Sequence, residues 1–327
     1  MPASIAALLM TLCPVASVAD DSAEVWLKRM QQAVENTNYE GTLVHMTPGR
    51  VEQFRVYHRV AEEITTERLV LVDGAGAEII RTPDEVICIF PEQQSVVIES
   101  RLVAYADQGP LRANLPAFST DMIEYYELSV QADDRVAERA SKVIVIKPQD
   151  QYRYGYRLWL DRETAMPLKS QLIGDDASMP LEEIRFISIS LPDEISKEAV
   201  QPSIDTSKYH VVRHSKAPQY QQDNGEVISW RSHDVPPGFM LSVSRFEYIS
   251  GNNSPRIHLV YTDGLASVSV FLDVDVAVSE QVEGFSMMGA ANAYSLMKQG
   301  FLVTAMGEVP PRTVQRIAVS MSATEMH

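Results

Sequence analysis

The stretch from Tyr152 to Asp161 constrains the fold of this chain most strongly, because it alternates with the period of two that is typical of a β-strand with two unlike faces. One face would be aromatic and aliphatic, with Tyr152, Tyr154, Tyr156, Leu158 and Leu160. The other would carry Arg153, Gly155, Arg157 and Trp159. We predict a central strand of a large antiparallel sheet with arginine stems packed over its outer face. The alternative is a sheet whose second face receives an amphiphile or a partner segment.

The sequence on both sides of this strand, from Gly41 to about Ser190, consists of short strand-like runs separated by turn signals such as Asp73-Gly74. Connections this short join antiparallel neighbours and leave no room for crossover helices. We predict one sheet of about ten strands, and twisted open sheets of that width usually curl. Residues 101–127 mix apolar residues with Pro110 and Pro116, which predicts helical pieces on the concave side. The first domain, residues 20–195, is therefore expected to be an unclosed half-barrel with a helical plug.

A change of character after this region predicts a second domain. Residues 196–224 are broken by prolines and end in a polar run, which is typical of a linker. Residues 225–327 contain a clear hairpin around the turn Thr262-Asp263-Gly264. Pro310-Pro311 opens a closing helix, since proline is favoured at the first helical position. The expected fold class is thus α+β and mainly antiparallel, with a smaller sheet and a C-terminal helix in the second domain.

The N-terminal segment predicts export. Residues 1–19 contain an apolar run of signal-peptide length, and Ser17-Val18-Ala19 places small residues before the expected cleavage site. Once Cys13 leaves with the signal, Cys88 is alone, so no disulfide is expected within the chain. We predict a soluble exported protein.

Charge and motifs exclude several classes of function. The net charge of -16 and the pI ≈ 4.9 argue against a nucleic-acid partner, which would favour a basic stripe. The chain contains no Gly-x-Ser-x-Gly elbow, no Walker A motif and no His-Glu-x-x-His motif. His210 and His214 have a metal-binding spacing, but we predict solvated side chains. We expect no enzyme activity, no metal and no cofactor.

One stretch of the second domain, Gly284 to Tyr294, has no charged residue. Its methionines, Met287 and Met288, are flexible apolar side chains that can serve an adaptable binding surface. The simpler interpretation, which we prefer at this point, is that they form the core of a small domain.

These residues together carry a resemblance to the MucB/RseB family of periplasmic regulators of the sigma-E envelope-stress response. In the first domain, the similar stretches are Asn38-Tyr39-Glu40-Gly41-Thr42-Leu43, Glu67-Arg68-Leu69-Val70 and the hairpin that contains Tyr152–Asp161. In the second domain they are Pro236-Pro237-Gly238-Phe239, Tyr261-Thr262-Asp263-Gly264-Leu265 and Gly307-Glu308-Val309-Pro310-Pro311-Arg312-Thr313. Their order and spacing extend the resemblance from about residue 24 to residue 322.

The resemblance implies a first domain similar to lipoprotein carriers of the LolA/LolB type, with an apolar cleft. It also implies binding to the periplasmic region of a MucA/RseA-like anti-sigma factor, which would be shielded from a DegS-like site-1 protease. Lipopolysaccharide or another amphiphile would release the shield. The alternative is a lipid or lipoprotein carrier or sensor without an anti-sigma partner, and a homodimer is left open.

We select candidate site residues by their aromatic and apolar character on the expected faces. For the lipid cleft these are Phe54, Val56, Leu115, Phe118, Tyr152, Tyr154, Tyr156 and Leu158. For the partner surface they are Trp230, Phe239, Tyr261, Met287 and Met288.

Overall fold

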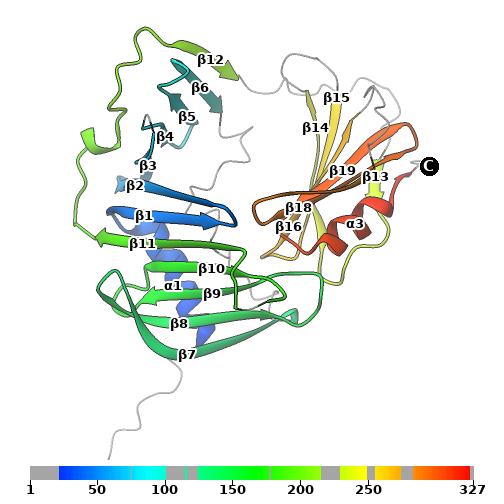
Figure 1. Cartoon of the computed structure of the whole chain (residues 1–327), viewed down its shortest axis with the longest axis horizontal. Helices are drawn as coiled ribbons and strands as arrows, with labels where there is room; N and C mark the ends of the chain where they lie inside the picture. The colour runs from blue at the N-terminus through cyan, green and yellow to red at the C-terminus, as the bar shows by residue number, and fades with distance from the viewer. Residues whose placement is uncertain are drawn as a thin grey trace, which may run out of the picture.

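The structure is a computed structural model that describes residues 22–74, 76–100, 115, 124–176, 178–214, 229–248, 255–273 and 283–324. These residues form two β-rich domains that lie side by side, with a helix across one face of the larger sheet (Figure 1). No helix within these ranges is both long enough and apolar enough to cross a membrane.

The first domain is built on a 12-stranded sheet in the order β12-β6-β5-β4-β3-β2-β1-β11-β10-β9-β8-β7. Its strands are β1 (Tyr39–Thr47), β2 (Arg50–Ala61), β3 (Ile64–Leu71), β4 (Glu78–Arg81), β5 (Glu85–Phe90), β6 (Ser95–Ser100), β7 (Tyr126–Val136), β8 (Arg139–Pro148), β9 (Gly155–Asp161), β10 (Pro167–Ile173), β11 (Glu182–Ser190) and β12 (His210–His214). Neighbours pair antiparallel except β12, which pairs parallel with β6. Strands β12 and β7 remain at opposite edges, so the sheet is not closed into a barrel. The predicted fold class is confirmed.

The central strand begins later than predicted. β9 starts at Gly155, because the preceding residues form a bend in which the Tyr152 amide donates to the Asp150 carboxylate at 2.9 Å. Gly155 also lies so close to β8 that an added Cβ would be 2.6 Å from the Ile146 carbonyl oxygen. Tyr152 and Tyr154 therefore do not continue the face of Tyr156, Leu158 and Leu160.

The segment predicted as a linker is partly structured. It contains a short 3-10 helix, η3 (Glu198–Val200), and strand β12. Arg68 donates to the Ala199 carbonyl at 3.2 Å, and the Ser203 amide donates to the Glu78 carboxylate at 3.1 Å. Residues 198–203 are thus held against β3 and β4 by side chains of the sheet, which composition alone could not reveal.

Helix α1 (Ala23–Asn36) lies across the inner face of the large sheet (Figure 1). Ser22 begins it as N-cap, because its hydroxyl accepts from the Val25 amide at 3.3 Å. Its buried stripe contains Trp26, Leu27, Met30, Ala33 and Val34. The predicted plug, residues 101–127, lies mostly outside the described residues, although Leu115 is described and packs against the core next to α1.

The second domain has a six-stranded antiparallel sheet in the order β14-β15-β16-β19-β18-β17. The strands are β14 (Met240–Tyr248), β15 (Pro255–Thr262), β16 (Ser267–Asp273), β17 (Gly284–Met288), β18 (Ala291–Lys298) and β19 (Phe301–Gly307). A separate pair joins β13 (Ser229–Ser232) to β20 (Met321–Thr324). Helix α3 (Pro311–Val319) begins at Pro311 and packs Val314, Ile317 and Ala318 into the core of this domain.

Candidate functional site

The inner face of the large sheet is the face of β9 that carries Tyr156, Leu158 and Leu160. Both leucines are fully buried in a cluster with Trp26, Leu27 and Met30 of α1, and Tyr156 packs against that cluster. Burial raises the pKa of the Tyr156 phenol, and the nearby acidic side chains add to this effect. Trp159 lies on the opposite face, where its Nε1 donates to Asp134 at 2.8 Å and the Lys169 ammonium lies 4.3 Å from its ring centre.

The other predicted cleft residues divide into three groups. Val56 is buried and Phe54 half-buried in the neighbouring core cluster, and Leu115 packs between the two clusters. Phe118 lies outside the described residues. Tyr152 and Tyr154 lie at the contact with the second domain. The inner face is therefore apolar as expected, while its role in holding a lipid remains a prediction.

Tyr152 and Tyr154 help to join the two domains. The Tyr154 hydroxyl accepts from the Asn292 side-chain amide at 3.1 Å, and the same amide group donates to the Val309 carbonyl at 2.9 Å. The Tyr152 carbonyl accepts from the Thr313 hydroxyl at 2.7 Å, at the start of α3. These bonds fix the bend before β9 against the second domain.

Arg153, between the two tyrosines, is the centre of this junction and is only 2% exposed. Its guanidinium pairs with Asp263 of the β15–β16 turn at 2.8 Å and with Asp150 at 2.7 Å, and it donates to the Pro237 carbonyl. The Tyr126 hydroxyl donates to the same Asp263 carboxylate at 3.0 Å. The Leu265 and Ala266 amides also donate to the Asp263 carboxylate, so hydrogen bonds compensate its buried charge. The Arg153 Nε lies close to this carboxylate but has no hydrogen bond of its own, and the guanidinium donates instead through its two Nη atoms, to Asp150 and to the Pro237 carbonyl.

Aromatic rings surround the same guanidinium. Its carbon lies 4.7 Å from the ring centre of Tyr125, 5.6 Å from Tyr126 and 5.1 Å from Phe239. The chain passes Tyr125 at Gly238, whose φ of +83° favours glycine and where an added Cβ would lie 2.4 Å from the Tyr125 ring. The Pro236-Pro237-Gly238-Phe239 stretch thus forms one wall of the junction.

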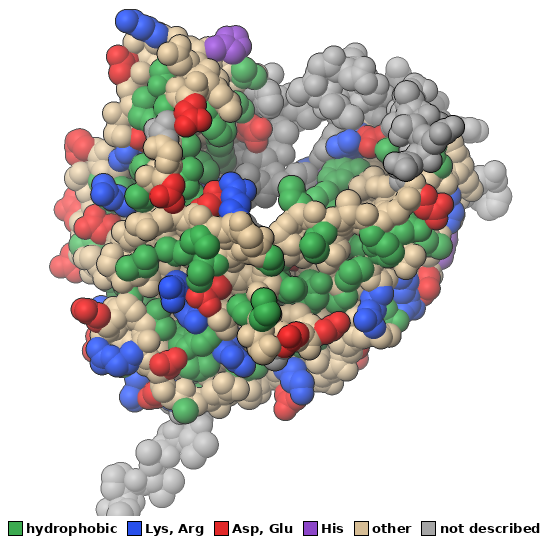
Figure 2. Space-filling view, viewed as in Figure 1, with side chains coloured by type: hydrophobic (Ala, Val, Ile, Leu, Met, Phe, Trp, Pro, Cys, Tyr) green, Lys and Arg blue, Asp and Glu red, His purple; other side chains and the backbone are tan. Residues whose placement is uncertain are grey.

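The predicted partner residues fall into a buried group and an exposed group. Trp230, Phe239 and Tyr261 are buried in the core of the second domain, so they offer no surface to a partner in this conformation. Met287 and Met288 are 74% and 75% exposed on β17, an edge strand of the described sheet. Phe285 of the same strand is also exposed. Figure 2 shows hydrophobic side chains gathered on the face of the second domain over its sheet.

Sequence reasoning missed Phe285 and the Arg153–Asp263 pair. Phe285 lies in the uncharged stretch already singled out, so the absence of charge was a usable signal. The ion pair had no such signal, because a single sequence gives no reason to match an arginine in one domain with a turn aspartate in another.

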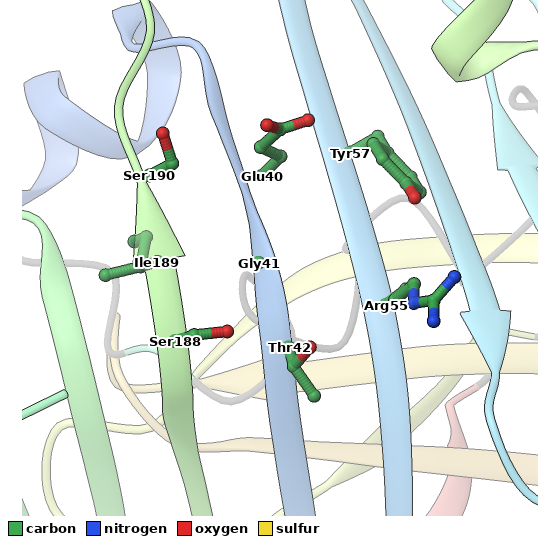
Figure 3. A pocket seen from close by; sticks show the side chains of 8 residues that line it. All are labelled: Glu40, Gly41, Thr42, Arg55, Tyr57, Ser188, Ile189 and Ser190. Atoms are coloured by element: carbon green, nitrogen blue, oxygen red, sulfur yellow. The ribbon is translucent and has the colours of Figure 1, made fainter.

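A pocket of about 350 Å³ lies on the outer face of the large sheet, over β11, β1 and β2 (Figure 3). It is lined by Glu40, Gly41, Thr42, Arg55, Tyr57, Ser188, Ile189 and Ser190. The wall is mainly polar and includes both a carboxylate and a guanidinium. No histidine lines this pocket.

Within the described ranges, no group of three or more His, Cys, Asp or Glu side chains is arranged to hold a metal ion. Cys88 is half-buried, and burial raises the pKa of its thiol, which makes it a poor nucleophile.

Two docked β-domains, one with an unclosed sheet and the other with an exposed apolar edge, define a protein suited to binding a partner. Comparison with family models assigns both domains to the same family. The model of the MucB/RseB N-terminal domain matches residues 22–204, and the model of the MucB/RseB C-terminal domain matches residues 224–322. The chain belongs to the MucB/RseB family.

Individual relatives cover nearly the whole chain. The Sigma factor AlgU regulatory protein MucB of Pseudomonas aeruginosa is 30% identical, over 97% of this chain and 96% of its own. The Sigma-E factor regulatory protein RseB of Haemophilus influenzae is 28% identical, over 95% and 94%. Among solved structures, the complex of P. aeruginosa MucA/MucB is similar with a TM-score of 0.72 and 27% identity, covering 93% of this chain and 99% of that one. A structure of MucB in complex with MucA(peri) has a TM-score of 0.69 and 27% identity, with 93% and 100% covered.

Proposed function

We propose that this chain is a periplasmic, non-enzymatic regulator that binds the periplasmic region of a MucA/RseA-like anti-sigma factor and shields it from site-1 proteolysis. The observation that carries the proposal is the similarity, over nearly the full length of both chains, to MucB as solved with MucA. The names of the regulatory relatives support the same role. Residues 1–19 would serve as the export signal.

The surface proposed for the partner is the β17 edge, which we define as Phe285, Met287 and Met288. These side chains are exposed, and the strand lies at the edge of the described sheet. Methionine side chains adapt to the shape of a partner, and an edge strand can pair with an extended peptide. A partner segment of low charge would fit this edge, because no residue from Gly284 to Met297 is charged.

The proposed signal is lipopolysaccharide or another envelope amphiphile that binds in the first domain. The apolar inner face formed by Tyr156, Leu158 and their neighbours supports this part of the proposal. An amphiphile would release the anti-sigma factor only if it binds the partner-free protein more tightly than the complex. The same inner face supports a second candidate, a lipid carrier without an anti-sigma partner, and that candidate predicts acyl lipid extracted with the purified protein.

The proposal is tested with the purified chain and the periplasmic segment of the anti-sigma factor encoded in the same genome. We expect binding at micromolar concentration or tighter, and slower cleavage of that segment by its site-1 protease. Absence of binding at these concentrations would overturn the regulator. Adding lipopolysaccharide should restore cleavage, and its failure to do so would remove only the sensing step.

The β17 edge is tested with the double variant Met287→Glu and Met288→Glu. We expect binding to weaken at least tenfold, about 1.4 kcal/mol, because two carboxylates would have to be desolvated at the interface. Met179→Glu is the matched control, since Met179 is 71% exposed in the first domain. If the double variant and the Met179→Glu control bind the anti-sigma segment with equal affinity, the partner does not bind at β17. If the edge instead binds a second copy of this chain, the double variant would abolish a concentration-dependent dimer.

A further inference from the structure

The polar pocket over β11, β1 and β2 is a feature that the proposed function leaves unused (Figure 3). Its volume of about 350 Å³ is at the lower end of the range of small-molecule sites, roughly 300–1,000 Å³. Glu40 and Arg55 supply opposite charges, and Figure 3 shows the carboxylate and the guanidinium apart from each other. Thr42, Ser188 and Ser190 add hydroxyl groups. A ligand in this pocket would therefore meet hydrogen-bond donors and acceptors on several sides.

These polar side chains are not engaged by the protein itself. None of them has a hydrogen-bond or ion-pair partner among the residues that the structure describes. Charged side chains on either side of the pocket, on the same outer face, are paired by contrast. Arg68 pairs with Glu78 at 2.9 Å, and Lys169 pairs with Glu183 at 3.1 Å. A carboxylate and a guanidinium on neighbouring strands that do not pair with each other remain available to a ligand.

A β-bulge and a close approach of two strands shape the pocket. The register between β1 and β11 shifts just after Thr42, and Ile187 is the extra residue of the bulge. Bulges redirect neighbouring side chains and are common beside functional sites. At Gly41 an added Cβ would lie 2.2 Å from the Ser188 carbonyl oxygen, so only glycine lets β1 and β11 approach this closely. The backbone thus fixes the position from which Ser188 reaches the pocket.

The lining argues against several classes of ligand. Strand β1 pairs with β2 on one edge and with β11 on the other, so an extended peptide cannot add to it as a further strand. Glu40 would repel a phosphate or a carboxylate, and Arg55 would repel a metal cation. The one aliphatic side chain of the lining, Ile189, packs against the inner core, so an acyl chain would find little apolar surface. What remains is a polar ligand without net charge.

A sugar ring matches the groups that line the pocket. Each sugar hydroxyl donates one hydrogen bond and accepts others, so neighbouring hydroxyls can donate to the Glu40 carboxylate and accept from the Arg55 guanidinium. Hydrogen bonds to charged groups are the stronger ones. Tyr57, half-buried in the wall, offers an aromatic ring with an apolar body and a polar tip, which suits the C–H face of a sugar.

We propose that this pocket binds one or two rings of a neutral saccharide, with Glu40 accepting from sugar hydroxyls and Arg55 donating to them. The site is on the outer face of the large sheet, whereas the surface proposed for an amphiphile is the inner face and the surface proposed for the anti-sigma factor is the β17 edge. Saccharide binding is therefore a separate activity, and it does not depend on whether the chain binds an anti-sigma factor.

The test is saturation-transfer difference NMR of the intact chain, followed by calorimetric titration. The probes are the neutral sugars glucose, galactose, N-acetylglucosamine, maltose, lactose and chitobiose. We expect at least one of them to bind with a Kd of about 1 mM or tighter. Inorganic phosphate and the zwitterionic dipeptide glycylglycine are the comparison ligands and should bind more weakly. A chain that binds none of these sugars would overturn the proposal, and so would one that prefers phosphate or the dipeptide to every sugar.

Variants then locate the bound sugar. Glu40→Ala and Arg55→Ala should each weaken binding by about tenfold or more, because each removes hydrogen bonds to a charged group. Ser190→Phe, at an exposed position, should abolish binding by filling the pocket. Glu127→Ala is the matched control, since it removes an exposed carboxylate on the edge strand β7, and it should bind like the unmodified chain. If all three pocket variants, checked for folding by circular dichroism, bind as tightly as this control, the sugar binds elsewhere and the proposal fails.

Discussion

Two surfaces of the second domain differ in almost every physical respect. The junction surface is buried against the first domain, and it uses charge: Asp263 meets Arg153 with additional bonds from Asp150 and Tyr126. The β17 edge is exposed and uncharged. Its strand pairs with β18 on one side, and the Phe285 ring lies 4.8 Å from that of Tyr294.

This difference indicates different tasks. A charge buried without its partner costs several kcal/mol, so the junction holds the domains together in one particular orientation. A flexible apolar edge imposes no such geometry and can accept a partner that differs in detail. Single substitutions at the junction are therefore expected to lower the free energy of unfolding strongly. Substitutions at the β17 edge are expected to change only the affinity for a partner.

The largest effect is expected for Arg153→Met, which keeps much of the side-chain stem but removes the charge. Asp263 would be left buried and without its cation, so we expect a loss of about 3–5 kcal/mol in the free energy of unfolding. Urea denaturation of the intact chain measures it. Arg162→Met is the control, because the Arg162–Asp133 pair is on the surface and should contribute less than about 1 kcal/mol. If Arg153→Met and Arg162→Met lose similar amounts of unfolding free energy, the buried Arg153–Asp263 pair contributes no more than a surface pair.

A substitution beneath the junction comes next. Ile317→Ala removes a fully buried side chain of α3, the helix whose first turn holds Thr313 against Tyr152. We expect a loss of about 2–5 kcal/mol in thermal or urea unfolding. Val319→Ala, on the exposed end of the same helix, should change stability by less than about 0.5 kcal/mol. An Ile317 effect below that value would mean that α3 is not packed as described.

Tyr126→Phe tests whether the junction acts as one network. It removes only the hydroxyl that donates to Asp263, and hydrogen bonds to charged groups contribute about 1.5–3 kcal/mol. The effect should be smaller than that of Arg153→Met, because Asp263 keeps its cation. Combining the two variants gives a double-mutant cycle. If the loss in the double variant equals the sum of the two single losses within about 0.5 kcal/mol, the hydroxyl and the guanidinium act independently.

The sequence predicted more of the fold than of these surfaces. Alternation over Tyr156–Asp161 was sufficient to place Tyr156, Leu158 and Leu160 on one face, because strand geometry is local. The same alternation extended the strand wrongly to Tyr152, since a bend held by Asp150 and by contacts from the second domain leaves the pattern unchanged.

The same dependence on contacts between distant segments explains why the sequence predicted the partner surface only in part. Trp230, Tyr261 and Met287 are all apolar or aromatic residues of the second domain, yet the first two are core and the third is surface. What separates them is the order of strands in the sheet, and the order depends on pairing between segments far apart in the chain. A single sequence carries the residue types of an edge strand, but not the fact that it is at the edge.

The smallest effect on stability is expected at that edge. Met288→Ser replaces a side chain that is 75% exposed, so unfolding should change by less than about 0.5 kcal/mol. Affinity for the anti-sigma segment should nevertheless fall, because the methionine would be buried only in the complex. Denaturation and binding are measured on the same preparation, with Met179→Ser as the control that changes neither. A destabilised Met288→Ser protein would show that β17 is covered in the free chain, and the contrast between the two surfaces would then fail.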